Sequence, residues 1–159
     1  MHVVNIHKRI INQPKTEVSP LLETLAAKND KIWPNSKWPK IRFKNGLKVG
    51  EKGGHGTIRY AVEDYIQGEL IVFRFLTPKG FDGIHKFEII KASGNKTEVK
   101  HSIIMTTHGL ATLQWVSIIR WLHDALIENA FDVIENNFSK EKIVTKWSMW
   151  VRLWRFILK

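Results

Sequence analysis

The sequence predicts an α+β protein in which an antiparallel sheet of six or seven strands has helices gathered on one face. Two patterns indicate this fold class. Residues 41–108 alternate short strand-like runs with glycine and asparagine turn signals, which is typical of hairpins. Residues 117–138 instead follow a helical period with one apolar side. At 159 residues, of which 43% are hydrophobic, the chain is long enough for one domain with a sizeable core.

The first element is predicted to be a short strand near the N-terminus, ended by Pro14. Val4 and Ile6 alternate with the polar residues Asn5 and His7. We therefore expect Val4 and Ile6 to form the buried face of this strand.

Two short helices are expected after this strand. Ser19 can cap the first, with Pro20 at its first position. The second is a single helical turn within residues 32–39, where two Trp-Pro pairs otherwise favour an irregular connection.

Five further strands are predicted in residues 41–43, 57–65, 69–76, 84–90 and 97–108. Because the connections between them are short, neighbouring strands should be antiparallel. Side chains alternate between the two faces of a strand, so each strand presents one apolar set to the interior. That inner set is His85, Phe87, Ile89, Val99, His101, Ile103 and Met105, with Phe73 and Phe75 from the neighbouring strand.

The long helix of residues 117–138 should cover the inner face of the sheet. At about 100° per residue, its charged residues form a stripe that we expect to face solvent: Arg120, Asp124, Glu128, Asp132 and Glu135. The opposite side is apolar and comprises Trp115, Val116, Ile119, Leu122, Leu126, Ala130, Val133 and Ile134. His123 lies on this apolar side, so a third imidazole should face the same interior as His85 and His101.

Residues 139–159 form a second segment with a character of its own. They hold six basic residues and a single acid, Glu141, and therefore carry half of the net charge of +10. Helical spacing places a narrow polar stripe among tryptophans, which favours an amphipathic helix on an anionic membrane surface. The alternative is that this helix folds back onto its own domain or onto a partner subunit. The membrane-contact residues would be Trp147, Trp150, Arg152, Trp154 and Arg155.

The glycine-rich stretch GGHGTIRY, residues 53–60, lacks the spacing of a phosphate-binding loop that precedes a helix. A strand follows it, so its glycines are expected to permit a tight turn. His55 would then lie at a cavity mouth or on the surface. Phe81, on a glycine-flanked loop, is either an entrance residue or a loop anchor.

Composition and spacing disfavour several chemistries. The absence of cysteine excludes disulfides and thiolate metal sites. No serine is paired with a recognisable base, and Asp124 diverges from His123 by about 100° around the helix, so a hydrolytic triad is not predicted. His85, His101 and His123 are a candidate zinc triad. Hydrogen bonding to water, to one another or to a ligand is the commoner use of such residues, and we expect no metal and no cofactor.

Four stretches, KNDKIWPNSKWP, GLKVGEKGGHGTIRYAVEDY, FRFLTPKGFDGIHKFEI and WLHDALIEN, resemble a bacterial branch of the SRPBCC superfamily. This superfamily includes START lipid-transfer domains, pathogenesis-related proteins and polyketide cyclases. The resemblance covers residues 1–138. It implies a helix-grip fold, in which a curved sheet wraps around a long C-terminal helix and encloses a largely apolar cavity. The superfamily has no universal catalytic motif, so a cavity is implied but no particular reaction.

These observations predict binding or transport of a hydrophobic small molecule or lipid, without catalysis. The alternative is a polyketide cyclase- or dehydratase-like enzyme whose cavity histidines move protons. The ligand-binding residues would be His85, His101, His123, Phe73, Phe75, Phe87, Ile103, Met105 and Ile119.

Expectations about partners and location follow from the same patterns. The strand aromatics are predicted to point inward, so no nucleic-acid partner is expected, whereas a homodimer is compatible with the sequence. The N-terminus lacks a signal-peptide pattern, which favours the cytoplasm, with the tail as a means of reaching the inner face of the membrane.

Overall fold

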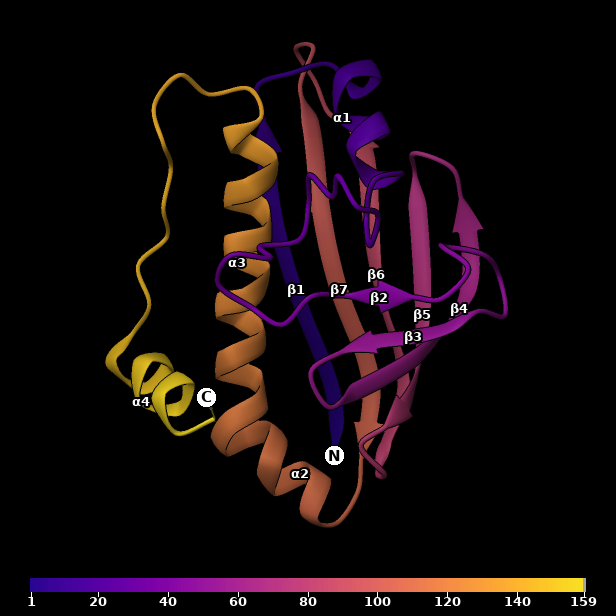
Figure 1. Ribbon diagram of the computed structural model, residues 1–159, viewed down its shortest axis with the longest axis vertical. Coiled ribbons are helices and arrows are strands. Elements are labelled where there is room, and N and C mark those ends of the chain that lie inside the picture. The colour runs from indigo at the N-terminus through magenta and orange to yellow at the C-terminus, as the bar shows by residue number, and fades with distance from the viewer. Residues whose placement is uncertain (159) are drawn as a thin grey trace.

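The computed structural model describes residues 1–158, and a seven-stranded antiparallel sheet forms one of its layers (Figure 1). The strand order is β1-β7-β6-β5-β4-β3-β2. Consecutive strands from β2 to β7 are neighbours, which confirms the predicted hairpins, and β1 pairs with β7. The strands are β1 His2–Ile11, β2 Arg42–Phe43, β3 Lys52–His55, β4 Ile58–Ile66, β5 Leu70–Thr77, β6 Phe81–Lys91 and β7 Thr97–Thr107.

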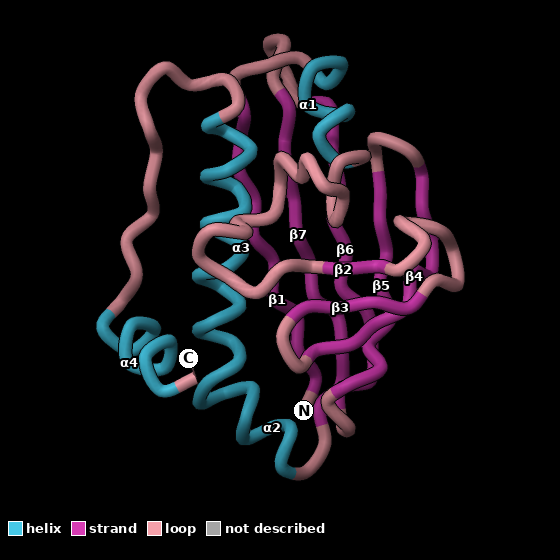
Figure 2. Tube along the Cα trace, viewed as in Figure 1, coloured by secondary structure: helices cyan, strands magenta, loops and turns pink. Residues whose placement is uncertain are grey.

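Helices form the second layer, on one side of the sheet (Figure 2). Side chains of α3 such as Leu126 and Phe131 share a core with Phe73, Phe87 and Val99 of the sheet. The predicted α+β helix-grip class is therefore confirmed. The helices are α1 Lys15–Leu22, α2 Leu110–Gln114, the π-helical turn η1 Trp115–Ile119, α3 Arg120–Asn136 and α4 Met149–Ile157.

The predicted facing of β1 is wrong. Val4 and Ile6 are 56% and 49% exposed, whereas Val3 and Ile11 are buried. The inward set also includes His7 and Arg9, because the acidic residues of α3 lie opposite them and pair with them. Apolar alternation therefore misleads on this strand, since its interior neighbours are charged.

The charged stripe on α3 was expected to face solvent, and this expectation is also wrong, because part of the stripe packs against β1. Arg9 donates to Glu128 Oε2 and to Asp132 Oδ1, both at 2.8 Å, and the Asp132 side chain is only 5% exposed. A helical projection identifies which side chains share a side, but it does not show that a basic strand covers that side.

A π-helical turn also shifts the apolar side at the start of the long helix. Trp115 is buried as expected, but Val116 is 45% exposed. The π-turn η1 holds five residues, Trp115–Ile119, and its wider winding breaks the 100° step assumed in the projection.

Helix α1 begins earlier than predicted. It starts at Lys15, directly after Pro14, so Pro20 lies inside it and Ser19 is not its cap. The second helix is reduced to the single turn expected within the irregular connection, at residues 35–37, where the carbonyl oxygen of Pro34 accepts from the amides of Lys37 and Trp38. Asp30 organises this connection, because its carboxylate accepts hydrogen bonds from the amides of Ala26, Ile32 and Trp33.

The C-terminal segment folds back onto its own domain. After α3 the chain runs in extended form beside this helix, where Thr145 donates its amide and hydroxyl to Asp132 and Ile143 bonds with Asn136 (Figure 1). The predicted amphipathic helix is present but shorter, over Met149–Ile157, and its Val151 is buried. No helix within residues 1–158 has the length and apolar character needed to cross a membrane.

Candidate functional site: a histidine-lined cavity beneath α4

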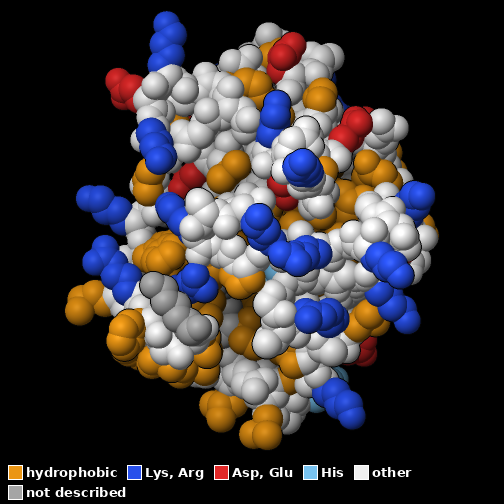
Figure 3. Space-filling model, in the orientation of Figure 1, with side chains coloured by type: hydrophobic (Ala, Val, Ile, Leu, Met, Phe, Trp, Pro, Cys, Tyr) orange, Lys and Arg blue, Asp and Glu red, His pale blue; other side chains and the backbone are white. Residues whose placement is uncertain are grey.

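A cavity of about 320 Å³ lies between the sheet, α3 and α4. Aromatic and aliphatic side chains make most of its wall, and in Figure 3 hydrophobic side chains gather around α4, at one side of this region. The apolar lining residues are Trp33, Trp38, Pro39, Ile58, Phe75, Phe81, Ile103, Trp115, Ile118, Ile119, Leu122, Leu126, Ile127 and Leu158.

The structure brings the three predicted histidines together at this cavity. His85 comes from β6, His101 from β7 and His123 from α3, and all three line the wall. The ring centroids of His85 and His101 are 5.6 Å apart, and those of His101 and His123 are 5.0 Å apart. The rings thus form a continuous row from sheet to helix.

Several nitrogens in this row are buried without a hydrogen-bond partner in the described chain: His85 Nε2, His101 Nδ1 and both ring nitrogens of His123. Burial lowers the pKa of His85 and His101, and the neighbouring imidazoles lower it further. Burial also lowers the pKa of His123, although Asp124 opposes this. The three rings are therefore neutral at pH 7, and each presents one donor and one acceptor nitrogen.

His55 is a fourth histidine of this site, and the strand that carries it was not predicted. It is the last residue of β3, and its ring lies 4.9 Å from that of Trp33 and 6.0 Å from that of Tyr60, centroid to centroid. Burial, with smaller effects of His123 and Arg59, lowers its pKa to about 4. The sequence signal for this residue is the stretch GGHG, because the glycines indicate a tight turn, and such a turn fixes the position of the histidine beside it.

The predicted apolar residues divide into two groups. Phe75, Ile103 and Ile119 line the cavity, whereas Phe73, Phe87 and Met105 are buried in the core and are not part of its lining. Phe81 is a tucked anchor, because it is buried against Phe75 and Trp115 with ring centroids 5.6 and 6.1 Å away. Sequence reasoning missed Trp33 and Trp38, which reach the cavity from an irregular connection without periodicity.

Arg155 of α4 and Leu158, the residue that follows this helix, contribute to the cavity wall. The Arg155 guanidinium lies 4.6 Å from the centre of the Trp38 ring and donates to the carbonyl oxygen of Lys37 at 2.6 Å. Trp147 Nε1 donates to Asn129 Oδ1 at 2.7 Å. Trp147 and Arg155 thus hold α4 against the domain.

The other three residues predicted for membrane contact have mixed surroundings. Trp150 is 43% exposed and donates from Nε1 to the carbonyl oxygen of Ser117. Trp154 is partly buried, with its ring 5.8 Å from that of Trp150, and Arg152 is exposed.

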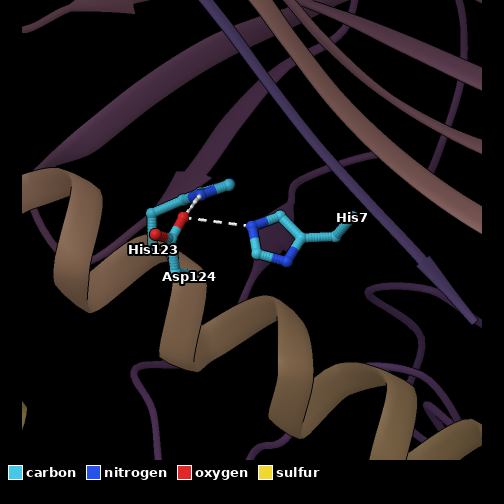
Figure 4. Close-up of side chains that lie close together, drawn as sticks. All are labelled: His7, His123 and Asp124. Carbon is cyan, nitrogen blue, oxygen red and sulfur yellow. Dashed lines mark hydrogen bonds and ion pairs between the residues drawn. The ribbon is translucent and has the colours of Figure 1, made fainter. Parts of the chain in front are cut away.

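A charged network adjoins the cavity at His123 (Figure 4). Asp124 Oδ1 lies 3.0 Å from His7 Nε2, accepts a hydrogen bond from Asn5 at 2.9 Å, and lies 3.5 Å from His123 Nδ1. The last distance is an ion-pair contact and not a full hydrogen bond. The expectation that these adjacent residues would diverge is therefore too simple, since the Asp124 carboxylate bends toward the His123 ring.

His7 is clamped between two carboxylates, because its Nδ1 lies 2.8 Å from Glu128 Oε1. Burial lowers the pKa of His7, but Asp124 and Glu128 outweigh it and raise this pKa to about 9. Burial raises the pKa of Asp124, yet contacts with His123 and His7 bring it well below its usual range. At pH 7 the network therefore contains an imidazolium between two carboxylates.

Metal-ligand geometry is confined to this network. Within residues 1–158, the only trio of histidine, aspartate or glutamate side chains whose ligand atoms all lie within 4.8 Å of one another is His7, His123 and Asp124. The nitrogens of His85, His101 and His123 do not converge in this way in the described chain.

Comparisons with known proteins address the fold. No protein-family model and no curated protein matches the sequence. Solved structures do match. The protein XoxI from Bacillus cereus is similar over 86% of this chain and 95% of its own, with 11% identity and a TM-score of 0.63. CalU16 from Micromonospora echinospora covers 99% of this chain and 84% of its own, with 12% identity and a TM-score of 0.58.

A truncated norcoclaurine synthase from Thalictrum flavum is also similar, over 89% of this chain and 96% of its own. The identity is 9% and the TM-score is 0.66. At such low identity these likenesses establish a shared helix-grip fold, and any function must be argued from the residues of the cavity.

Proposed function

We propose that the protein binds a hydrophobic small molecule in the cavity beneath α4. The main support is the row of buried, neutral imidazoles with free nitrogens inside an otherwise apolar wall. Buried polar atoms without partners are costly in a folded protein, and a ligand with a polar group would satisfy them.

The cavity wall indicates what such a ligand looks like. Apolar burial contributes about 25 cal/mol per Å², so the aromatic wall would supply most of the affinity. The neutral histidines can each donate and accept, which suits a hydroxyl or carbonyl group. A volume of about 320 Å³ is near the lower end of the usual range for ligand pockets, roughly 300–1,000 Å³. This favours one compact molecule over a diacyl lipid.

Native mass spectrometry of protein purified without a histidine tag tests this proposal directly. We expect a bound small molecule that organic extraction removes, and its return when the extract is added back. Ile119→Trp fills the cavity and should abolish this binding. Val116→Trp is the matched control, because Val116 is exposed on the same π-turn. Equal binding by both variants would contradict a ligand in the cavity.

Acid/base catalysis is the second candidate function, and the contact between His123 and Asp124 favours it. A cavity histidine with a carboxylate 3.5 Å from one ring nitrogen could act as a general base if that contact tightened when a substrate bound. Once a ligand is identified, His123→Gln distinguishes the two candidates. A binding protein should lose about tenfold in affinity or less, whereas an enzyme should lose about 10²–10⁴-fold in kcat.

For the tail, we propose that the outer face of α4 contacts an anionic membrane. Met149, Leu153, Phe156 and Ile157 are exposed on this short helix, and the basic residues of the tail flank them. The inward side of α4 remains on the domain, so Trp147 and Arg155 would not enter the lipid.

Co-sedimentation with phosphatidylglycerol vesicles tests the membrane proposal. The doubly substituted variant Met149→Glu with Phe156→Glu should lose binding, and Val4→Glu should retain it, because Val4 is exposed on the opposite layer. Equal sedimentation of the two variants would argue against contact through α4.

A further inference from the structure

Three side chains from distant parts of the sequence converge beside the cavity. His7 belongs to β1, and His123 and Asp124 belong to the first turn of α3. Figure 4 shows both imidazoles directed at the same carboxylate oxygen of Asp124. We propose that His7, His123 and Asp124 form a binding site for a divalent transition-metal ion of the zinc type.

The spacing of the ligand atoms fits such an ion. Zinc binds imidazole nitrogen and carboxylate oxygen at about 2.0–2.2 Å with tetrahedral geometry, which places ligand atoms about 3.3–3.6 Å from one another. Asp124 Oδ1 lies 3.0 Å from His7 Nε2 and 3.5 Å from His123 Nδ1. The ligand nitrogens of His7 and His123 lie within 4.8 Å of each other. Movements of up to about an ångström, with loss of the proton that His7 Nε2 shares with Asp124, would therefore bring all three atoms into coordination.

The surrounding residues are arranged as they are around metal ligands in other proteins. A ligating histidine usually gives its second ring nitrogen to a carboxylate, which fixes the orientation of the ring. His7 does this through Nδ1, which lies 2.8 Å from Glu128 Oε1. Glu128 is itself held by Arg9 at 2.8 Å, and Asn5 Nδ2 orients Asp124 at 2.9 Å.

His123 supplies the observation that hydrogen bonding alone leaves unexplained. Both of its ring nitrogens are inaccessible to solvent and lack a hydrogen-bond partner in the described chain. A cation at Nδ1 would satisfy one of them. His7 and Asp124 satisfy each other without an ion, whereas His123 does not gain a full hydrogen bond from either.

The donor set also indicates which ions fit. Two imidazoles with one carboxylate suit Zn²⁺, Co²⁺ or Fe²⁺ better than Mg²⁺ or Ca²⁺, which prefer oxygen ligands throughout. Three protein ligands leave a fourth position for water. This site shares His123 with the row of cavity histidines that the sequence suggested, takes its other two ligands from outside that row, and needs no organic ligand in the cavity.

Metal binding by the full chain tests the proposal. The protein is purified without a tag, treated with a chelator and dialysed against Zn²⁺ or Co²⁺ alone. We expect one ion per chain and, with Co²⁺, the visible absorption of a tetrahedral complex. His7→Gln and Asp124→Asn should each weaken Zn²⁺ binding by more than tenfold. Glu128→Gln should weaken it by about tenfold through the orientation of His7.

Histidines elsewhere serve as matched controls. His85→Gln removes a cavity imidazole outside the trio, and His108→Gln removes an exposed one. Both variants should bind Zn²⁺ as the unaltered chain does. A stoichiometry well below one ion in the unaltered chain would overturn the proposal even if a substituted chain failed to fold. Loss of the ion in His85→Gln, with retention in His7→Gln, would overturn it as well.

Discussion

His55 shows how one residue couples this cavity to pH. It is neutral because burial against Trp33 and Tyr60, close to Arg59 and His123, lowers its pKa to about 4. In the unfolded chain its pKa returns to about 6.5. Between these two values the unfolded state binds more protons, so stability is complete above pH 6.5 and is lost as the pH falls toward 4.

We therefore expect the free energy of unfolding to drop between pH 7 and pH 5, with His55 contributing on the order of 1–2 kcal/mol. Urea unfolding in the presence of a chelator measures this drop. His55→Gln should make the drop smaller, while His108→Gln, at an exposed position, should leave it unchanged. A drop of the same size in both variants would show that His55 does not titrate as described.

Asp132 is a second residue with a large expected effect. Its carboxylate accepts hydrogen bonds from Arg9, from Asn129 and from the amide and hydroxyl of Thr145, so it joins β1, α3 and the tail. Asp132→Asn removes the charge that compensates the half-buried Arg9. We expect a loss of at least about 2 kcal/mol in the free energy of unfolding.

Chemical denaturation checks this value. Glu135→Gln is the control, because Glu135 reaches Arg9 at only 3.3 Å and is more exposed than Asp132. Glu135→Gln should lower the free energy of unfolding by less than about 1 kcal/mol. If the two variants lost similar amounts of stability, the burial of Asp132 would not strengthen its ion pair with Arg9.

Among individual residues, the cavity histidines were predictable from the sequence, but the charged network of His7, Asp124 and Glu128 beside them was not. Strand alternation is local, so it correctly turned His85 and His101 inward. The pairing of His7 with Asp124 joins residues 117 positions apart, and neither residue lies in a pattern that indicates the other. Such contacts depend on which strand pairs with which edge of the sheet.

Among the elements, α4 depends on few contacts for its position. The Arg155 guanidinium lies beside the rings of Trp38 and Trp147, 4.6 and 5.9 Å from their centres, and donates to the carbonyl oxygen of Lys37. Arg155→Ala should therefore loosen the helix. We expect backbone amides of Met149–Ile157 to exchange with deuterium about tenfold faster. This corresponds to a decrease of about 1.4 kcal/mol in the free energy of local opening.

Hydrogen exchange followed by mass spectrometry measures this change. Arg152→Ala alters an exposed arginine of the same helix and should leave the exchange rates as they are. Faster exchange across the whole chain, instead of in α4 alone, would indicate global destabilisation and contradict a local role for Arg155.

The elements differ in how far their sequences determine them. Six of the seven strands followed from alternation and turn residues, and each was found within a few positions of its predicted place. Strand β3 was missed because Lys52–His55 contains two glycines, which have no side chain to alternate. The sequence predicts that α1 starts at Pro20, but the helix begins at Lys15, and Val18, which precedes Pro20, is buried on the same helix as Leu21.

For the whole molecule, the layers were predictable but the position of the tail was not. Alternating runs followed by a long amphipathic helix sufficed for sheet and helix. The tail had two open alternatives, because a tryptophan-rich basic helix suits a membrane and a protein surface alike. Arg155 finds a partner in Trp38, which lies far away in sequence, and Trp147 finds one in Asn129 of α3. This placement puts Leu158 at the cavity wall.

The return path of the chain after α3 bears on how the cavity is filled. Helix α4 forms one wall of the cavity, yet it belongs to no strand pair, so it can move away without disturbing the sheet. Release of this one helix would open the cavity, and the free energy of that local opening would set how fast a bound molecule enters and leaves.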